Sequence, residues 1–317
     1  MSIEYKILLY YKYTKVENPE ALAAWHRGVC EVLGLKGRIL IAKEGINGTV
    51  EGTVENTERY KEMLREIGKT PGTKMMGKFS NIEFKESVGT GRAFPKMKIK
   101  VRNEIVSLHL GDEDVDPNKI TGKRLSPDEL KRWYQSNEDF VVLDMRNDYE
   151  YAVGRFKNSV NPQIENFREV PQHLEEIAKY KDKKVLTVCT GGVRCEKASG
   201  YLLKNGFKDV YQLHGGMHKY MEKFPGEDFL GTLYTFDGRI VMDFGGKREI
   251  VGKCYFCGNL SERYENCARP ECNRRFIRCN ECAEREEKEW CSAECRNVNI
   301  VLDTRHYSSG NPVDLKL

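Results

Sequence analysis

Apolar and polar positions alternate in several short runs of the N-terminal third of the chain. Between these runs, two longer segments repeat apolar residues every three to four positions, which is typical of helices with one buried face. The pattern predicts strands at 5–13, 37–42, 82–86 and 97–101, a further strand after 47–48, and helices at 19–33 and 55–67. A tight turn at Asn47-Gly48 is expected to lead into the third strand. This order of elements predicts a ferredoxin-like or acylphosphatase-like α+β sandwich over residues 1–110.

The middle of the chain changes to an alternation of strand and helix patterns. Residues 111–125 are polar and acidic and are predicted to form a linker. A helix begins after Ser126, which is followed by proline and two acids, the residues favoured at a cap and in a first turn. The alternation over 126–225 predicts a parallel sheet with helices on both faces, so the whole chain is expected to be an α/β multidomain protein.

The C-terminal part is predicted to hold three smaller segments. Residues 226–250 indicate a hairpin connector around Asp237-Gly238. Residues 251–296 are rich in cysteine and indicate a metal-binding module, and residues 297–317 form a tail without periodicity.

The segment 185–199, VLTVCTGGVRCEKAS, combines a strand, a thiol and the start of a helix. The apolar run ends at Cys189, and Gly191 and Gly192 allow the following amides to turn inward around an approaching group. The helix N-terminus and the charge of Arg194 would lower the pKa of the Cys189 thiol. These four residues are our candidate catalytic residues. The alternative is that Cys189 is a small buried residue ending a core strand.

Three further features accompany this loop. Cys195 is either a resolving thiol for the nucleophile or a buried residue of the first helical turn. Asp144 and Arg146 end a strand, and a structural ion pair is favoured over a chemical role for them. His214 and His218 flank a glycine pair without nearby carboxylate or cysteine ligands, so packing or solvent contact is favoured over metal binding.

Eight of the eleven cysteines lie in four closely spaced pairs near the C-terminus. The pairs are Cys254 and Cys257, Cys267 and Cys272, Cys279 and Cys282, and Cys291 and Cys295. Such spacing supplies ligands for two tetrahedral sites, which predicts two zinc ions. An iron–sulfur cluster is the alternative metal centre, whereas disulfides would need an oxidising compartment. The order of the pairs leaves open which of them share an ion.

Basic residues alternate with apolar ones in the strand predicted at 97–101. Side chains two positions apart point to the same face of a strand, so the basic residues form a stripe. The stripe consists of Lys96, Lys98, Lys100 and Arg102, and Arg92 precedes it. Such a stripe is suited to a phosphate backbone, which makes these five residues candidate RNA-binding residues. An alternative interpretation, to which we give equal weight, is that the stripe is a solvated face that protects an edge strand from pairing.

Length and composition limit the class of protein. A chain of 317 residues exceeds one typical core, and 39% hydrophobic with 32% charged residues is ordinary for a soluble protein. No apolar run approaches the roughly 20 residues of a membrane helix, and the N-terminus resembles no signal peptide, so we expect a cytoplasmic protein. The net charge of +4 is too small to decide a partner.

The loop around Cys189 resembles the active-site loop of rhodanese domains, whose cysteine carries a persulfide. Val141–Arg146 and Glu150–Asn161 resemble that family's strand-Asp-x-Arg and Glu-Tyr-x-x-Gly segments, and Val210–Gly216 resembles its closing strand and Gly-Gly turn. Together with the N-terminal segment ILIAKEGINGTV and the eight-cysteine module, residues 1–296 resemble the bacterial tRNA uridine hydroxylase family TrhO.

The resemblance implies an oxidoreductase that converts the wobble uridine of tRNA to 5-hydroxyuridine with molecular oxygen, with Cys189 as the catalytic cysteine. The electron donor, the set of tRNAs and the oligomeric state stay open. Our mechanistic hypothesis is that the Cys189 thiolate adds to C6 of a base flipped out of the anticodon loop, with Arg194 and the loop amides binding the developing oxyanion. The alternatives are a rhodanese-type sulfurtransferase acting through a cysteine persulfide and a non-enzymatic zinc adaptor.

Overall fold

The computed structural model of the chain describes residues 3–246, 249–285 and 290–296. These residues divide into two compact units, 1–252 and 253–317. The first unit contains two domains, each built on a five-stranded sheet, and the second is a small cysteine-rich unit. The predicted combination of an α+β sandwich, an α/β domain and a cysteine-rich region is confirmed. No helix of the described ranges is long and apolar enough to span a membrane.

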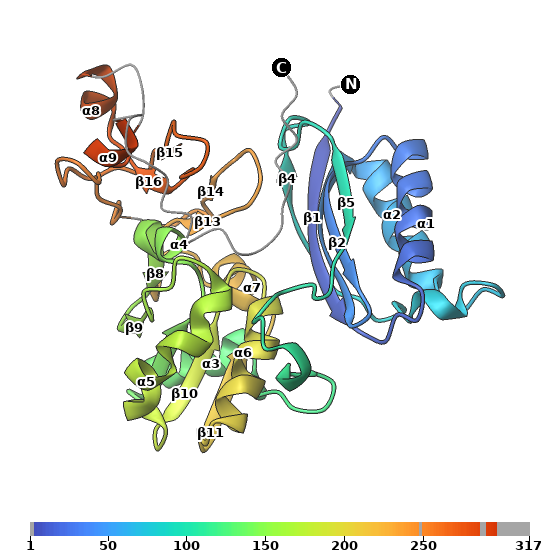
Figure 1. Cartoon of the computed structure of the whole chain (residues 1–317), viewed down its shortest axis with the longest axis horizontal. Helices are drawn as coiled ribbons and strands as arrows, with labels where there is room; N and C mark the ends of the chain where they lie inside the picture. The colour runs from blue at the N-terminus through green and yellow to red at the C-terminus, as the bar shows by residue number, and fades with distance from the viewer. Residues whose placement is uncertain (1–2, 247–248, 286–289, 297–317) are drawn as a thin grey trace. The chain divides into compact units, whose positions relative to one another are not determined.

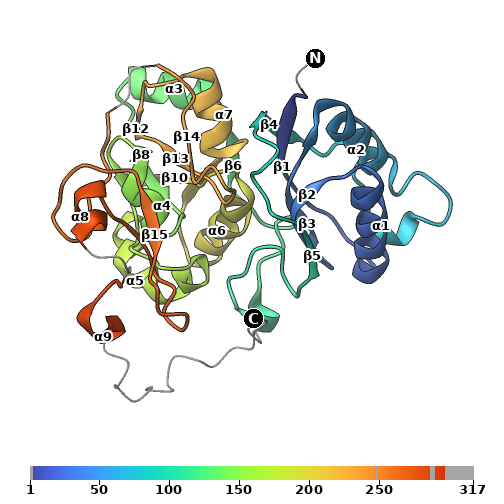
Figure 2. The same ribbon diagram turned by 90° about the horizontal axis from the view of Figure 1, so that it is seen from above.

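The N-terminal sheet has the strand order β4-β1-β3-β2-β5, with every neighbour antiparallel except the parallel pair β2 and β5. Its strands are β1 (Tyr5–Tyr13), β2 (Lys36–Ala42), β3 (Gly45–Thr53), β4 (Phe84–Gly89) and β5 (Met97–Val101). Both α1 (Pro19–Val32) and α2 (Val54–Glu66) lie against one face of the sheet (Figures 1 and 2). Leu8, Ile39 and Leu64 belong to the core between sheet and helices. The opposite face of the sheet is left for other contacts.

The turn predicted at Asn47-Gly48 is wrong. Both residues lie inside β3, and the β2–β3 hairpin turns at positions 43 and 44. Gly48 pairs with Tyr10 across β1 and β3, and a Cβ at position 48 would come within 2.4 Å of the Tyr10 ring. The glycine is therefore required by a tyrosine on the neighbouring strand and does not mark a turn.

The second domain has a parallel sheet of order β6-β11-β10-β7-β9. Its strands are β6 (Lys123–Leu125), β7 (Val141–Asp144), β9 (Ser159–Val160), β10 (Lys184–Val188) and β11 (Asp209–Leu213). Its helices are α3 (Pro127–Gln135), α4 (Asp148–Val153), α5 (Leu174–Ile177), α6 (Val193–Lys204) and α7 (Gly216–Lys223). Val185 packs into the core with α5 and α6, whereas Leu186 packs with α3 and α7. Helices on both faces of a parallel sheet are thus confirmed.

The segment predicted as a linker takes part in this domain. Its last three residues form β6, which pairs with β11 at the edge of the sheet. Val115, earlier in the segment, is 1% exposed and belongs to the core cluster that includes Val185. The acidic and polar composition of this segment predicted a linker, but its few apolar residues pack against the α/β domain and fix the segment there.

Short elements complete the structure. The 3₁₀ turns are η1 (Lys74–Met76), η2 (Gly111–Glu113), η3 (Phe167–His173) and η4 (Ala178–Tyr180). In the first unit, β8 (Gly154–Phe156) pairs with β12 (Phe229–Gly231), and β13 (Leu233–Tyr234) pairs with β14 (Val241–Met242). The second unit holds β15 (Tyr264–Asn266), β16 (Arg275–Ile277), α8 (Asn280–Arg285) and α9 (Ala293–Arg296). The tail predicted at 297–317 lies outside the described residues.

Candidate active site

The loop that carries Cys189 follows the carboxyl end of β10 and leads into α6. Gly192 occupies the cap position of α6 with a φ of 100°, in the left-handed region that favours glycine. Its backbone N–H donates a hydrogen bond to the Cys189 Sγ at 3.1 Å. A Cβ at Gly216, where α7 begins, would come within 2.7 Å of the backbone of Cys189 and Gly191. The glycines therefore let the loop bend around the sulfur and let α7 close against it.

The surroundings of the Cys189 sulfur favour its thiolate form. Burial alone would raise the pKa of Cys189, but a hydrogen bond from the Cys195 thiol, the charge of Arg194 and the N–H groups of Cys195 and Gly192 together lower it to about 6. Burial and the neighbouring Cys189 sulfur raise the pKa of Cys195 well above its ordinary value. At pH 7 the two sulfurs therefore form a pair of one thiolate and one thiol.

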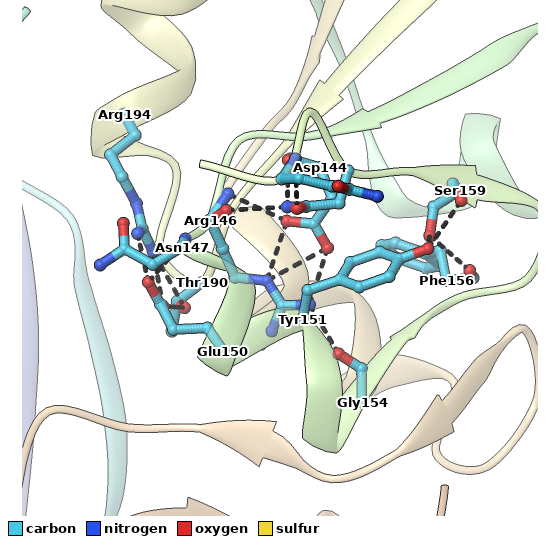
Figure 3. Close-up of polar contacts among 12 residues, drawn as sticks. Asp144, Arg146, Asn147, Glu150, Tyr151, Gly154, Phe156, Ser159, Thr190 and Arg194 are labelled. Atoms are coloured by element: carbon cyan, nitrogen blue, oxygen red, sulfur yellow. Dashed lines mark hydrogen bonds and ion pairs between the residues drawn. The ribbon is translucent and has the colours of Figure 1, made fainter. Parts of the chain in front are cut away.

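Arg194 is held by Glu150, a partner that the sequence analysis did not identify. The guanidinium Nη1 and Nη2 lie 2.5 and 2.8 Å from the two Glu150 carboxylate oxygens (Figure 3). The Thr190 hydroxyl donates to the same carboxylate at 3.3 Å. Both partners are buried, at 8% and 0% residue exposure for arginine and glutamate. This bidentate geometry orients Arg194 so that its charge acts on Cys189 while its terminal nitrogens are bound to carboxylate oxygens.

Asp144 and Arg146 form a second, separate ion pair deeper in the domain. The Arg146 Nε and Nη2 donate to the two Asp144 oxygens at 2.9 and 2.7 Å, and Nη2 also donates to the Gly154 carbonyl at 2.6 Å (Figure 3). Both side chains are fully buried. The pair ties β7 to β8 and does not line the cavity over Cys189, which agrees with the structural role favoured from the sequence.

A cavity of about 350 Å³ lies over the Cys189 loop, within the unit 1–252. Its walls come from the open face of the N-terminal sheet, the β13–β14 hairpin and the loop itself. The walls combine aliphatic residues and arginines with aromatic and amide side chains, and the aromatic and amide ones are Tyr11, Phe94, Phe167, Phe236, Asn47, Asn147 and Asn166. Cys189 also lines the cavity although it is 0% exposed. The residue is therefore part of the cavity wall, and its sulfur, which accepts the Gly192 N–H, lies just beneath the surface of that wall.

The two histidines of the Gly-Gly turn lie in different surroundings. His218 lines the same cavity, packs edge-on against Phe244 with ring centroids 5.1 Å apart, and has its pKa lowered to about 4 by burial, so it is neutral at pH 7. His214 Nε2 lies 3.3 Å from a Glu83 carboxylate oxygen. Within the described ranges, neither histidine belongs to a group that could hold a metal.

The predicted basic stripe lies along β5, at the edge of the N-terminal sheet, with Lys98 and Lys100 inside the strand and Lys96 and Arg102 directly before and after it. Lys98 pairs in register with Arg38 of β2, and Lys100 pairs with Leu40. Since Arg38 and Leu40 line the cavity, the stripe continues the cavity side of the sheet to its edge. All five predicted RNA-binding side chains are exposed, and no ion pair of theirs is found among the described residues. Arg92, however, lies in the loop before β5 and outside the alternation of the strand.

The eight C-terminal cysteines come together in two groups of four within the second unit. One group is Cys254, Cys257, Cys279 and Cys282, and the other is Cys267, Cys272, Cys291 and Cys295. In each group all four sulfurs lie within 4.8 Å of one another, and the sulfurs of Cys257 and Cys279 are 3.5 Å apart. Tetrahedral zinc–sulfur bonds of about 2.3 Å place sulfurs about 3.8 Å apart, whereas a disulfide needs about 2.0 Å. Each group could therefore hold one metal ion, with the first pair joined to the third and the second to the fourth.

Comparison with known proteins identifies the family. The chain is 47% identical over 294 residues to the tRNA uridine(34) hydroxylase of Cytophaga hutchinsonii, covering 92% of this chain and 90% of the relative. The proteins of the same name from Bacillus licheniformis and Enterococcus faecalis are 48% and 47% identical, with 93% and 92% of this chain covered, and 89% and 90% of theirs. This chain belongs to the tRNA uridine(34) hydroxylase family. The resemblance found in the sequence is thus confirmed.

Three domain families match consecutive parts of this member of the hydroxylase family. They are the UPF0176 acylphosphatase like domain at 5–105, the rhodanese-like domain at 126–223 and the rhodanase C-terminal region at 230–296. Among solved structures, a rhodanese-like domain protein from Staphylococcus aureus is 33% identical, covers 31% of this chain and 90% of its own, and has a TM-score of 0.28.

The sequence analysis missed several residues of the candidate site. Glu150 was identified only as part of a rhodanese-like segment, and its ion pair with Arg194 has no local signal in the sequence. Tyr11 was predicted only as part of a strand and Asn47 only as part of a turn. These residues reach Cys189 because the open face of the N-terminal sheet forms a wall of the same cavity. No local pattern reveals that proximity.

Proposed function

We propose that this protein hydroxylates C5 of uridine 34 in tRNA and that Cys189 is the nucleophile. The observation that carries the proposal is a thiol whose pKa is lowered to about 6, on a residue of a cavity wall that also includes aromatic and amide side chains. Family membership supports the substrate, since the relatives are named for uridine 34 of tRNA.

The cavity is suited to a base that has left the RNA stack. Position 34 belongs to the single-stranded anticodon loop, where a base can be splayed out and stacked on aromatic side chains. Tyr11 and Phe236 offer such surfaces, and Asn147 and Asn166 offer amide groups for the edge of uracil. The exposed lysines of β5 lie on the same side of the sheet as the cavity, and we expect them to contact the phosphate backbone that leads to the flipped base.

The reaction begins with addition of the Cys189 thiolate to C6 of uracil, which moves the C5–C6 π electrons to C5 and O4 as an enolate. The C5 carbanion then adds to molecular oxygen, the proposed co-substrate, and forms a peroxide at C5. A two-electron reductant of the thiol class then cleaves the O–O bond, releasing water and leaving a hydroxyl on C5. Loss of the C5 proton and departure of the Cys189 thiolate restore the double bond. In the overall reaction, uridine, oxygen and two thiols are converted to 5-hydroxyuridine, water and a disulfide.

Loop residues have distinct tasks in this scheme. Gly191 lines the cavity, so its backbone can approach the developing O4 oxyanion. Gly192 donates to the sulfur and Arg194, fixed by Glu150, keeps it ionised. Arg194 thus stabilises the nucleophile, and oxyanion binding is assigned to the amides. Cys195 donates to the Cys189 sulfur and is placed to act as a resolving thiol when the nucleophile becomes oxidised.

Each group of four cysteines is proposed to bind one zinc ion, giving two ions per chain. Four thiolates at these separations match the tetrahedral coordination of structural zinc. A closed set of four protein ligands leaves no position for substrate, so the ions would crosslink the short elements of the second unit. This unit is too small to depend on an apolar core alone, and metal binding supplies its folding energy.

Transfer RNA carrying 5-fluorouridine at position 34 tests the nucleophile. Fluorine at C5 blocks loss of the C5 substituent, so we expect a covalent adduct on Cys189 that mass spectrometry of the peptide locates. With unmodified tRNA, the nucleoside should gain one oxygen, and oxygen should be consumed. Exchange of oxygen for sulfur in the nucleoside would instead favour a sulfurtransferase, and an unchanged nucleoside would favour a non-enzymatic adaptor.

A further inference from the structure

A second, smaller cavity lies next to the Cys189 cavity, and Tyr11 lines both. Its volume is about 180 Å³, and polar side chains form most of its wall. Lys85, Arg124, Glu83, Glu196 and His214 are among the lining residues. The proposed reaction uses none of them. Both cavities belong to the unit 1–252.

The acids of this second cavity are already matched by cations. The Glu196 Oε1 lies 2.9 Å from Arg124 Nη2, and its carboxylate also accepts hydrogen bonds from Gln212 and from the Tyr11 hydroxyl. The Glu83 Oε2 lies 2.8 Å from Lys219 Nζ. Each carboxylate is therefore in direct contact with another cation and acts on Lys85 only from a longer distance.

Lys85 is a buried cation of this cavity, and no direct ion pair of its ammonium group is found among the described residues. It belongs to β4, points to the cavity side of the sheet and is 5% exposed. Among the residues that the structure describes, no carboxylate lies within 4.0 Å of its ammonium group, which instead lies over the face of the Tyr11 ring at 5.1 Å. Burial lowers the pKa of Lys85 to about 8, which leaves the group mostly charged at pH 7. A buried ammonium of this kind is costly unless an anion accompanies it.

We propose that this cavity binds a phosphate-type oxyanion through Lys85. The cavity is smaller than the roughly 300–1,000 Å³ typical of sites for drug-sized ligands, which favours a single small anionic group. Arg124, whose side chain is 61% exposed, stands at the opening and offers further donors in the planar arrangement that suits phosphate. The oxyanion is either free inorganic phosphate or a phosphate of the RNA backbone. The RNA source rests on the proposed function, with the base in the Cys189 cavity and a flanking phosphate in this one.

Thermal unfolding with and without phosphate tests the site itself. Chloride keeps the ionic strength constant, and Lys85→Met is compared with the wild type and with Lys74→Met, an exposed lysine outside the cavity. If free phosphate is the ligand, the wild type and Lys74→Met gain about 2–4 °C in Tm at saturating phosphate. Lys85→Met gains nothing and, having lost an unpaired buried charge, starts from a higher Tm.

Binding of tRNA in phosphate-free buffer tests the RNA source. If a backbone phosphate fills the site, Lys85→Met binds tRNA more weakly and the slope of log affinity against log salt falls by about 0.7–0.9, while Lys74→Met behaves as the wild type. Either result supports the site and identifies its ligand. Equal phosphate response and equal salt slope in Lys85→Met and the wild type overturn it. A wild type that fails to form 5-hydroxyuridine refutes the proposed reaction and leaves the phosphate-dependent Tm unaffected.

Discussion

Cys189 and the C-terminal cysteines bring sulfur into two different electrostatic settings. Around Cys189, the chain itself supplies every group that stabilises an anion: one thiol, two backbone N–H groups and the charge of Arg194. In each C-terminal group, four sulfurs lie within 4.8 Å of one another. Four thiolates at that spacing repel unless a cation lies between them. The first setting is complete and suits a reactive thiolate, whereas the second needs a metal ion and suits a structural crosslink.

Removal of metal should have the largest effect and should be confined to the second setting. A strong chelator is expected to unfold residues 253–296, because structural zinc contributes about 10–16 kcal/mol of apparent binding free energy to folding. Hydrogen exchange followed by mass spectrometry would show loss of protection there and unchanged protection in the α/β domain. Cys267→Ser should lower the zinc content from two ions per chain to one. Retained protection in chelated protein would contradict the assignment.

Substitution of the nucleophile should have the next largest effect. Cys189→Ser is expected to lower formation of 5-hydroxyuridine by at least about 1,000-fold, because a hydroxyl in the same place is not ionised at pH 7. Cys30→Ser is the matched control, since Cys30 is also buried but burial raises the pKa of its thiol to about 12. Nucleoside analysis of tRNA treated with each variant measures the difference. Equal activity of the Cys189 variant and the control would remove Cys189 from the mechanism.

The ion pair behind Cys189 allows a smaller, graded test. Glu150→Gln removes the acid that opposes Arg194, so destabilisation by about 3 kcal/mol is expected from a buried guanidinium left without its counter-ion. The same change leaves the positive charge beside the sulfur unopposed. The pH midpoint of Cys189 alkylation, near 6 in the wild type, should therefore move to lower pH.

Alkylation by iodoacetamide across a pH series, read on the Cys189 peptide, measures this shift. Glu165→Gln is the control, since Glu165 is exposed and lies outside the pair. A midpoint that rises in Glu150→Gln would mean that the glutamate orients Arg194 and that this orientation outweighs its charge.

Local sequence signals predicted the strand, loop and helix that hold the Cys189 sulfur. The other contacts of the site are formed between residues far apart in the sequence and could not be predicted from it. A β-branched run, a thiol and two glycines are adjacent in sequence, so the strand, loop and helix around Cys189 could be predicted. The pairing of Arg194 with Glu150 joins residues 44 positions apart, and no periodicity reveals it. The cysteines follow the same rule. Their spacing predicts four pairs, but the joining of first to third and second to fourth depends on the fold of the second unit.

The prediction of a turn at Asn47-Gly48 was wrong for a related reason. Asn-Gly is a strong local turn signal, but a glycine is also needed wherever a large side chain crosses close to the backbone. At position 48 the large side chain is that of Tyr10 on the neighbouring strand, whose ring leaves no room for a Cβ. The cavity escaped prediction in the same way, because alternation in β1 and β3 reveals which residues share a face and does not reveal which domain covers it.

Substitution of the β5 lysines should have the smallest effect. Like the cysteine groups, these lysines carry charge that the chain itself does not neutralise, so a binding partner is needed to neutralise it. In Lys98→Gln with Lys100→Gln, tRNA affinity should fall a few-fold, with kcat unchanged. The salt slope should decrease by about 0.7–0.9 for each RNA phosphate that a lysine no longer neutralises. Lys74→Gln with Lys78→Gln is the matched exposed pair, and filter binding over a salt series measures the slope. If the stripe only protects the sheet edge, the slope will stay the same and the β5 variant will instead self-associate, because removal of edge charge permits strand pairing between chains.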